Sequence, residues 1–93
     1  MNKINLGKEY GTCLSSRGIA AELRERILEN PNVWEIDCKD VYVISHSFAD
    51  ECFAVLVQLN NTEWFADNIK LINLEDNARN SILEAIFMRM TNE

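Results

Sequence analysis

The stretch VWEIDCKDVYVISHSFADECFAVLVQL, Val33–Leu59, decides most of what this sequence indicates about its fold. An apolar strand is predicted over Val33–Ile36, and it ends at Asp37. A second apolar run, Val41–Ile44, continues as extended chain after a polar turn. A strongly apolar helix is then predicted from Phe48 to about Leu59. A strand that leads into a helix in this way is typical of an α/β fold.

Polar side chains stand where the second apolar run meets the helix. Because the first turn of a helix has free N–H groups, it favours hydrogen-bond acceptors and negative charge. We therefore predict a site for binding a partner or ligand, or for modification, at this junction. Asp37 is included because α/β proteins place ligands at the carboxyl ends of strands. The predicted site residues are Ser45, His46, Ser47, Asp50, Glu51 and Asp37.

The same residues also have a purely structural interpretation. Ser47 and Asp50 have the spacing of a capping box, in which each side chain accepts a hydrogen bond from the other residue's N–H. Asp50 and Glu51 are adjacent, so they point about 100° apart on a helix and do not form an acid/base pair. We expect them to be a solvated acidic helix end. A phosphate on a serine beside them would repel a partner that docks through that acidic patch.

The flanking sequence predicts two more strand–helix units. The first has a strand at Lys3–Leu6 and a helix at Arg17–Asn30, capped by Ser15 or Ser16. The second comprises the polar loop Asn60–Asn68, the strand Ile69–Ile72 and a helix from about Glu75 to Met90. We expect a small α/β sandwich over residues 1–93, a single domain with a mostly parallel sheet of three or four strands and about three helices. The helices either cover one sheet face or both.

Two predicted helices carry residues whose environment the sequence leaves open. The apolar residues of the middle helix cover an arc of about 200°, wider than one sheet face requires. The excess, chiefly Phe53 and Val57, packs against a neighbouring helix or forms an interface with a partner. Arg89 falls inside the apolar arc of the last helix. We expect it to extend along apolar surface towards solvent, with an ion pair to a buried carboxylate as the alternative.

Composition excludes several classes of function. With nine Lys and Arg against fifteen Asp and Glu, the net charge of −6 disfavours nucleic acid and anionic membranes. No leader or run of about 20 apolar residues is visible, so we expect a soluble, cytoplasmic protein. The spacing of Cys13, Cys38 and Cys52 matches no metal or redox motif, and small apolar roles are expected. We expect no enzyme activity, metal or cofactor; a magnesium site at Asp37 with Asp40 or Asp50 is the weaker alternative.

The junction resembles a known family, the STAS-like domain of unknown function, whose core reads roughly v-x-x-D-F-x-x-V-x-x-I-S-x-S-F-A-D-E. The resemblance covers about Leu14 to Met90. It implies a relation to the STAS domains of anti-sigma factor antagonists, which bind a histidine-kinase-like ATPase and are phosphorylated on a serine at a helix start. The matching positions are Val33–Asp37, Val41, Ile44–Glu51, Ser16-Arg17, Asn73 and Arg89.

The resemblance has two departures. The antagonist motif D-S-S-G falls on Ser45, His46, Ser47 and Phe48, so its phosphorylated serine corresponds to His46. Cys38 also replaces the family's aromatic residue after Asp37. We therefore expect a non-enzymatic regulatory domain that binds a protein partner, with Ser47 or Ser45 as the modified hydroxyl. The alternative is a sensor that holds a nucleotide or another anion at the same helix start. The sequence leaves the partner's identity and the oligomeric state open.

Overall fold

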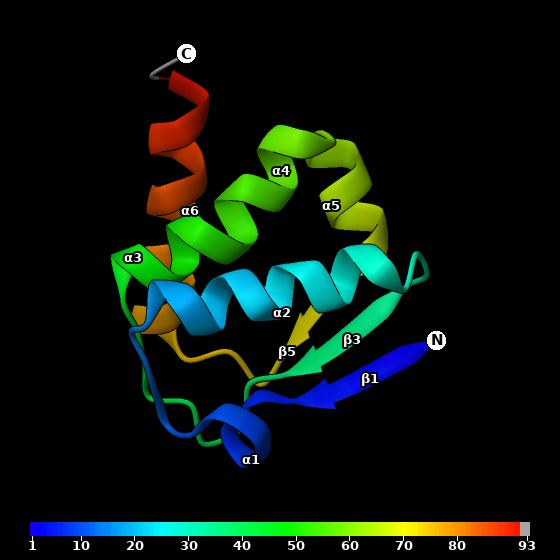
Figure 1. The fold of residues 1–93 in the computed structure, drawn as a ribbon. Helices are drawn as coiled ribbons and strands as arrows, with labels where there is room; N and C mark the ends of the chain where they lie inside the picture. Colours follow the sequence, from blue (N-terminus) through cyan, green and yellow to red (C-terminus); the bar gives the residue numbers. More distant parts are fainter. Residues whose placement is uncertain (92–93) are drawn as a thin grey trace.

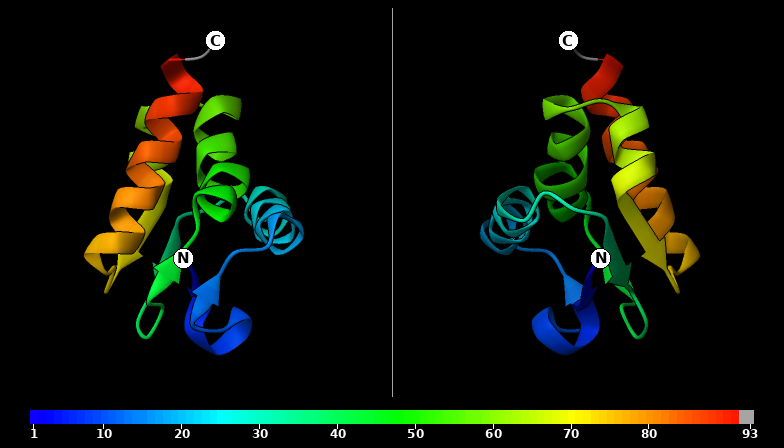
Figure 2. Two further views of the ribbon diagram at one scale, coloured as in Figure 1. Left: turned by 90° about the vertical axis from the view of Figure 1, so that its left-hand side faces the viewer. Right: turned by 90° about the vertical axis from the view of Figure 1, so that its right-hand side faces the viewer.

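The computed structural model describes residues 1–91 and contains a three-stranded parallel sheet with helices gathered on one side of it (Figures 1 and 2). The strands are β1 (Asn2–Asn5), β3 (Trp34–Asp37) and β5 (Ile69–Ile72), in the order β1-β3-β5. Both neighbouring pairs are parallel, with Ile4, Ile36 and Leu71 side by side. The predicted α/β fold with a parallel sheet is therefore confirmed.

The two faces of this sheet differ in polarity because successive side chains of a strand point to opposite sides. Trp34 and Ile36 point towards the helices and are buried. Lys3, Glu35 and Lys70 form a row across the opposite face, with 3.8 Å between Lys3 Nζ and Glu35 Oε2. The helices thus cover a single face, which is one of the two alternatives that the sequence left open.

Helix α2 (Arg17–Glu29) connects β1 to β3 and agrees with its prediction. Ser16 caps its start, because its Oγ accepts a hydrogen bond of 3.2 Å from the N–H of Ile19. The helix ends at Asn30, immediately before Pro31, which disfavours helical conformation in the preceding residue. The buried face of α2 consists of Ala20, Leu23 and Ile27.

The middle helix is continuous from His46 to Leu59 and begins two residues earlier than predicted. It consists of α3 (His46–Ala49), a π-helical turn η1 (Asp50–Ala54) and α4 (Val55–Leu59). A π turn inside an α-helix is rare and occurs frequently at functional sites. This helix supplies the two largest fully buried side chains, Phe48 and Phe53.

The predicted loop Asn60–Asn68 is wrong, because most of it forms helix α5 (Thr62–Asn68). Asn61 caps this helix through its side chain, which accepts a hydrogen bond of 2.6 Å from the N–H of Trp64. Trp64 and Phe65 then pack, half-buried, against the core. The polar composition concealed the helix, since it is held by a side-chain cap and by the packing of Trp64 and Phe65 against the core.

Shorter elements complete the described chain. Leu6 does not end the first strand as predicted but begins α1 (Leu6–Tyr10), which Asn5 caps. A second parallel pair joins β2 (Cys13–Leu14) to β4 (Val43–Ile44). The last helix, α6 (Asp76–Thr91), packs against η1, α3 and α4.

Candidate functional site

The helix start lies where the sequence placed it, but a different serine caps the helix. Ser45 Oγ accepts a hydrogen bond of 3.1 Å from the N–H of Phe48. The predicted capping box of Ser47 and Asp50 is therefore wrong, because Ser47 already belongs to the first helical turn. His46 begins the helix and is exposed, and Ser47 is half-buried. Among residues 1–91, no hydrogen bond engages the hydroxyl of Ser47.

Asp50 lies at the start of the π turn, where two arginines from other helices hold it. Arg89 of α6 donates from Nε to Oδ1 at 2.8 Å and from Nη2 to Oδ2 at 3.1 Å. Arg17 of α2 donates from Nη1 to Oδ2, also at 3.1 Å. The hydrogen bonds from Arg89 are the largest cause that holds the pKa of the Asp50 carboxyl below its ordinary value. A forked arginine pair of this kind is among the stronger charge-assisted contacts.

Glu51 makes a second set of contacts in the same place. Arg24 Nη1 donates to Glu51 Oε2 and to the Glu51 backbone carbonyl, both at 2.6 Å. Arg17 Nη1 reaches Glu51 Oε1 as well, at 3.4 Å. The hydrogen bond from Arg24 is the largest cause that lowers the pKa of the Glu51 carboxyl. A single guanidinium nitrogen of Arg17 therefore touches both carboxylates.

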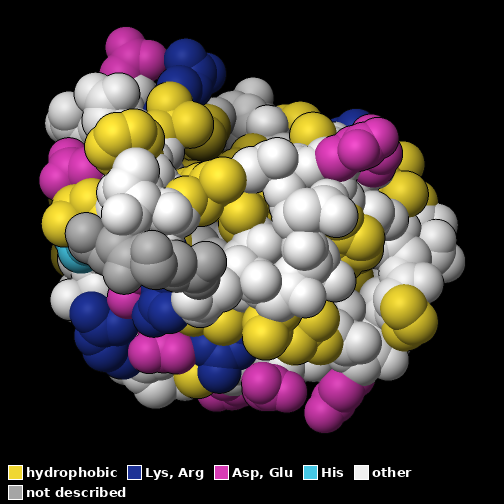
Figure 3. All heavy atoms as spheres, turned by 90° about the horizontal axis from the view of Figure 1, so that it is seen from above, with side chains coloured by type: hydrophobic (Ala, Val, Ile, Leu, Met, Phe, Trp, Pro, Cys, Tyr) yellow, Lys and Arg dark blue, Asp and Glu magenta, His cyan; other side chains and the backbone are white. Residues whose placement is uncertain are grey.

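These contacts form a network that we call the arginine clamp: Arg17, Arg24, Arg89, Asp50 and Glu51. The expectation of a solvated acidic helix end is wrong, since the side chains of Asp50 and Glu51 are 15% and 26% exposed. Figure 3 shows dark blue and magenta side chains together at one corner, with the histidine at the same edge. Arg89 is ion-paired, so the alternative for this residue is correct.

Sequence reasoning missed the three arginines as members of the site. Arg89 did give a signal, because it interrupts the apolar arc of its helix. Arg17 and Arg24 gave no signal of this kind, because charged residues on a helix surface are usual and their partners lie 27 to 34 residues away.

Asp37 lies apart from the clamp, at the carboxyl edge of the sheet. Its Oδ1 accepts hydrogen bonds of 2.9 Å from the side-chain amide of Asn73 and from the N–H of Lys39. The first of these bonds is the main reason that the pKa of the Asp37 carboxyl is lowered. Within residues 1–91, no hydrogen bond or ion pair joins Asp37 to the helix start, so the structure divides the predicted site in two.

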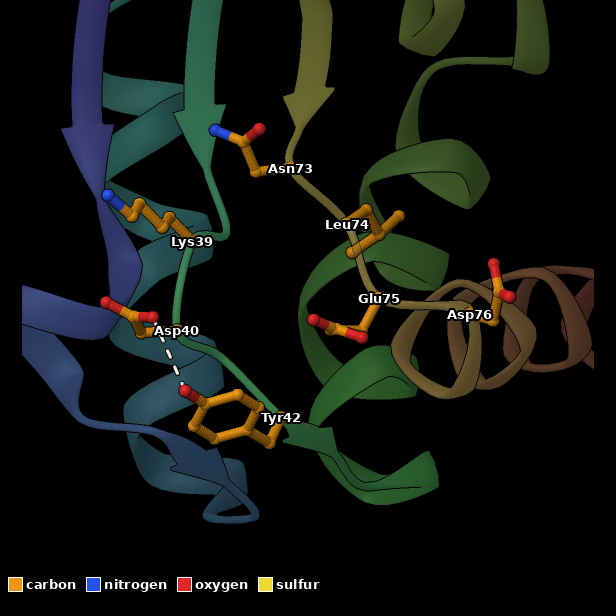
Figure 4. A pocket seen from close by; sticks show the side chains of 7 residues that line it. All are labelled: Lys39, Asp40, Tyr42, Asn73, Leu74, Glu75 and Asp76. Atoms are coloured by element: carbon orange, nitrogen blue, oxygen red, sulfur yellow. Dashed lines mark hydrogen bonds between the residues drawn. The ribbon is translucent and has the colours of Figure 1, made fainter.

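An open cavity of about 630 Å³ lies beside Asp37, between the loops that follow β3 and β5. Figure 4 shows Asp40 and Tyr42 on one side of it and Leu74 and Glu75 on the other. Tyr42 Oη lies 3.4 Å from Asp40 Oδ1. In the lining of this cavity, carboxylates outnumber cations. Among residues 1–91, no group of three His, Cys, Asp or Glu side chains is placed to hold a metal ion. The lining residues are Lys39, Asp40, Tyr42, Asn73, Leu74, Glu75 and Asp76.

Phe53 and Val57 are not part of an exposed interface. Phe53 is fully buried, and its ring packs against those of Phe48 and Phe65 with centroids 6.5 and 6.3 Å apart. Val57 is 4% exposed. The surplus apolar surface of the middle helix is therefore covered within the chain, partly by the helix α5 that the sequence did not reveal.

Two of the three cysteines have the small apolar role expected of them. Cys38 and Cys52 are fully buried, and burial raises the pKa of the Cys38 thiol to about 11. Burial likewise raises the pKa of the Cys52 thiol. Both thiols are thus protonated at neutral pH and are poor nucleophiles. Cys13 is exposed on the short strand β2.

A family model identifies the class of this protein. The model of the STAS-like domain of unknown function (DUF4325) matches residues 20–79, which contain β3, the helix start and β5. The chain therefore belongs to the family of STAS-like domains of unknown function, and the resemblance seen in the sequence is confirmed. No curated protein and no solved structure matches the chain. Within residues 1–91, every helix is too short or too polar to cross a bilayer.

Proposed function

We propose that this chain is a non-enzymatic regulatory domain that binds a protein partner through the surface around residues 45–51. Membership of a STAS-like family supports the proposal. The resemblance to anti-sigma factor antagonists favours a histidine-kinase-like ATPase as the partner, and phosphorylation of a serine as the switch.

One observation carries the proposal: the two serines of the junction have different roles. Ser45 Oγ is occupied in capping the helix, whereas the Ser47 hydroxyl is unengaged among the described residues and lies beside the exposed His46. A hydroxyl in the first helical turn accepts a phosphate favourably, because the helix dipole is positive there. Ser47 is therefore the hydroxyl that we assign to the switch.

The clamp changes the kind of partner that this surface suits. Its carboxylates are mostly covered, while the side chain of Arg17 is 51% exposed. The most accessible charge of the clamp is thus positive. A partner that presents carboxylates to Arg17 and His46 is favoured over the basic-rimmed partner that an acidic patch would attract.

The test compares two variants that add the same charge to the first turn of different helices. Ser47→Asp lies in the proposed surface, and Thr62→Asp lies in the first turn of α5. A partner isolated from the native host with the wild-type chain should bind Ser47→Asp at least about tenfold more weakly, a change of about 1.4 kcal/mol. Thr62→Asp should bind like the wild type. Equal affinity of the wild type and Ser47→Asp in titration calorimetry would refute the proposed surface.

The cavity favours a second function, that of a small-ligand sensor. Its position at the carboxyl ends of parallel strands is where α/β folds bind ligands. The carboxylates Asp40 and Glu75 favour a cationic ligand, such as a diamine, over a nucleotide. A ligand that binds the folded state raises the melting temperature. A thermal-shift screen should show a rise with diamines that Glu75→Gln abolishes; an unchanged melting temperature with diamines would count against this function.

A further inference from the structure

Arg17 holds a special position in the arginine clamp. Its Nη1 lies 3.1 Å from Asp50 Oδ2 and 3.4 Å from Glu51 Oε1, so it makes two moderate contacts with one nitrogen. Half of its side chain is exposed, against 15% for Arg24 and 32% for Arg89. Arg17 is thus the most accessible of the three arginines.

The clamp does not depend on Arg17 alone for charge balance. Without it, the Asp50 carboxylate keeps the two hydrogen bonds from Arg89, and the Glu51 carboxylate keeps the one from Arg24. Each carboxylate therefore has a shorter and more buried contact than the one it makes with Arg17. Arg17 can leave both carboxylates without stranding a buried charge, which is the costly event when an ion pair breaks.

Helical spacing puts Ser47 on the same face as the two carboxylates that Arg17 contacts. It precedes Asp50 by three residues and Glu51 by four, and residues three and four apart are neighbours on one face of a helix. Arg17 reaches this face from the first turn of α2, which packs against α3. A phosphate on Ser47 would carry a charge of about −1.5 to −2, larger than that of either carboxylate.

We propose that Arg17 is the residue that reads phosphorylation of Ser47, by leaving Asp50 and Glu51 and binding the phosphate. The inference rests on the proposed function, in which Ser47 is the regulatory hydroxyl. A protein kinase supplies the phosphoryl group from a nucleoside triphosphate. The bond between Ser47 Oγ and the γ-phosphorus forms as the bond between that phosphorus and the β–γ bridging oxygen breaks. The nucleoside diphosphate leaves, and the hydroxyl proton passes to the kinase or to water.

This exchange alters the surface in two ways at once. It adds negative charge at residue 47, and it withdraws the accessible cation from any partner that binds Arg17 through carboxylates. Arg24 and Arg89 keep the clamp closed during the exchange, so the helices remain in place. Phosphorylation then changes the binding surface without unfolding it.

The experiment uses the full chain carrying phosphoserine at position 47, and it measures the second pKa of the phosphate by ³¹P NMR. A cation in contact with the phosphate lowers this pKa, typically by about one pH unit or more. Arg17→Gln should remove the effect and place the pKa above that of the same phosphoserine in a short peptide, because Asp50 and Glu51 remain nearby. His46 is present in every variant and therefore cancels in the comparison.

Arg26→Gln is the matched control, because Arg26 lies on the same helix but pairs with Glu9 at 2.8 Å. It should leave the phosphate pKa where it is in the wild type. Circular dichroism of each variant verifies that it folds, and Arg17→Lys, which keeps the charge, should give an intermediate value. Equal pKa values for the wild type and Arg17→Gln would overturn the inference. The titration needs no partner, so a failure of the proposed partner binding is a separate result.

Discussion

Two groups of carboxylates in this molecule have opposite surroundings. At the helix start, Asp50 and Glu51 are held by three arginines that come from the two flanking helices, α2 and α6. At the carboxyl edge of the sheet, the carboxylates of Asp40, Glu75 and Asp76 line an open cavity with a single lysine. The first group is held by short arginine contacts, whereas the second faces solvent or a ligand, with an exposed 3.8 Å pair between Asp76 and Arg79.

The difference shows that the charged partners of a carboxylate depend on which elements of the fold meet around it. Helices packed side by side can bring long arginine side chains to the same point from different parts of the chain. The loops at the sheet edge bring mostly short or acidic side chains, and their hydrogen bonds, such as that of Asp37 with Asn73, are local to that edge. Substitutions in the core and at the helix start should therefore cost more stability than substitutions at the sheet edge.

The largest effect is expected in the core, at Phe53 of the π turn that also carries Asp50 and Glu51. Phe53→Ala should lower the free energy of unfolding by about 3–5 kcal/mol, because it leaves a cavity in the core. Phe87→Ala is the control, since Phe87 is 66% exposed on α6, and it should cost less than about 1 kcal/mol. Urea denaturation measures both. Similar losses for the two variants would mean that Phe53 is not a core residue.

Arg89 and Arg79 provide the next test, because both lie on α6 and pair with an aspartate. Arg89→Ala should cost about 2 kcal/mol, since it removes two charge-assisted hydrogen bonds to the mostly buried Asp50. Arg79→Ala should cost less than about 0.5 kcal/mol, since Asp76 is 93% exposed and 3.8 Å away. Thermal or urea unfolding distinguishes them, and equal costs would remove the basis for the clamp.

The clamp should contribute to the dependence of stability on pH. The folded-state pKa values of Asp50 and Glu51 are lowered, so their contribution is complete above the unfolded pKa values near 3.8 and 4.5. It is lost as the pH falls through the folded values. Between about pH 5 and 3, the double variant Asp50→Asn, Glu51→Gln should therefore show a flatter loss of stability than the wild type. Parallel slopes in urea titrations would contradict this assignment.

The smallest effect is expected at the sheet edge, where Asn73 has a left-handed conformation with φ of 56°. Asn73→Ala should cost about 1–2 kcal/mol, because it loses the hydrogen bond to Asp37 and keeps the unfavourable conformation. Asn73→Gly should lie within about 0.5 kcal/mol of the wild type, because glycine adopts this conformation freely and so offsets the lost bond. Equal costs in urea unfolding would show that the conformation of residue 73 is unimportant.

Local signals were sufficient to predict most of the fold. Alternating and helical spacing located β3, β5, α2 and α6, and the strand–helix order indicated a parallel sheet. The short helices α1 and α5 were missed, because each follows a capping asparagine in a polar or glycine-containing segment that resembles a loop. The middle helix was placed two residues late, since Ser45 and Ser47 are equally suitable caps in the sequence and only the backbone shows which one is used.

The order of residues was enough to establish the α/β class, the family and the location of a polar helix start after the second apolar run. These features follow from periodicity and from short motifs, which are local. The folded arrangement was needed to show that Asp50 and Glu51 are clamped, that Phe53 is covered and that Asp37 belongs to a separate edge. Each of these outcomes depends on contacts between residues far apart in the sequence, and helical or strand periodicity carries no information about which distant side chains meet.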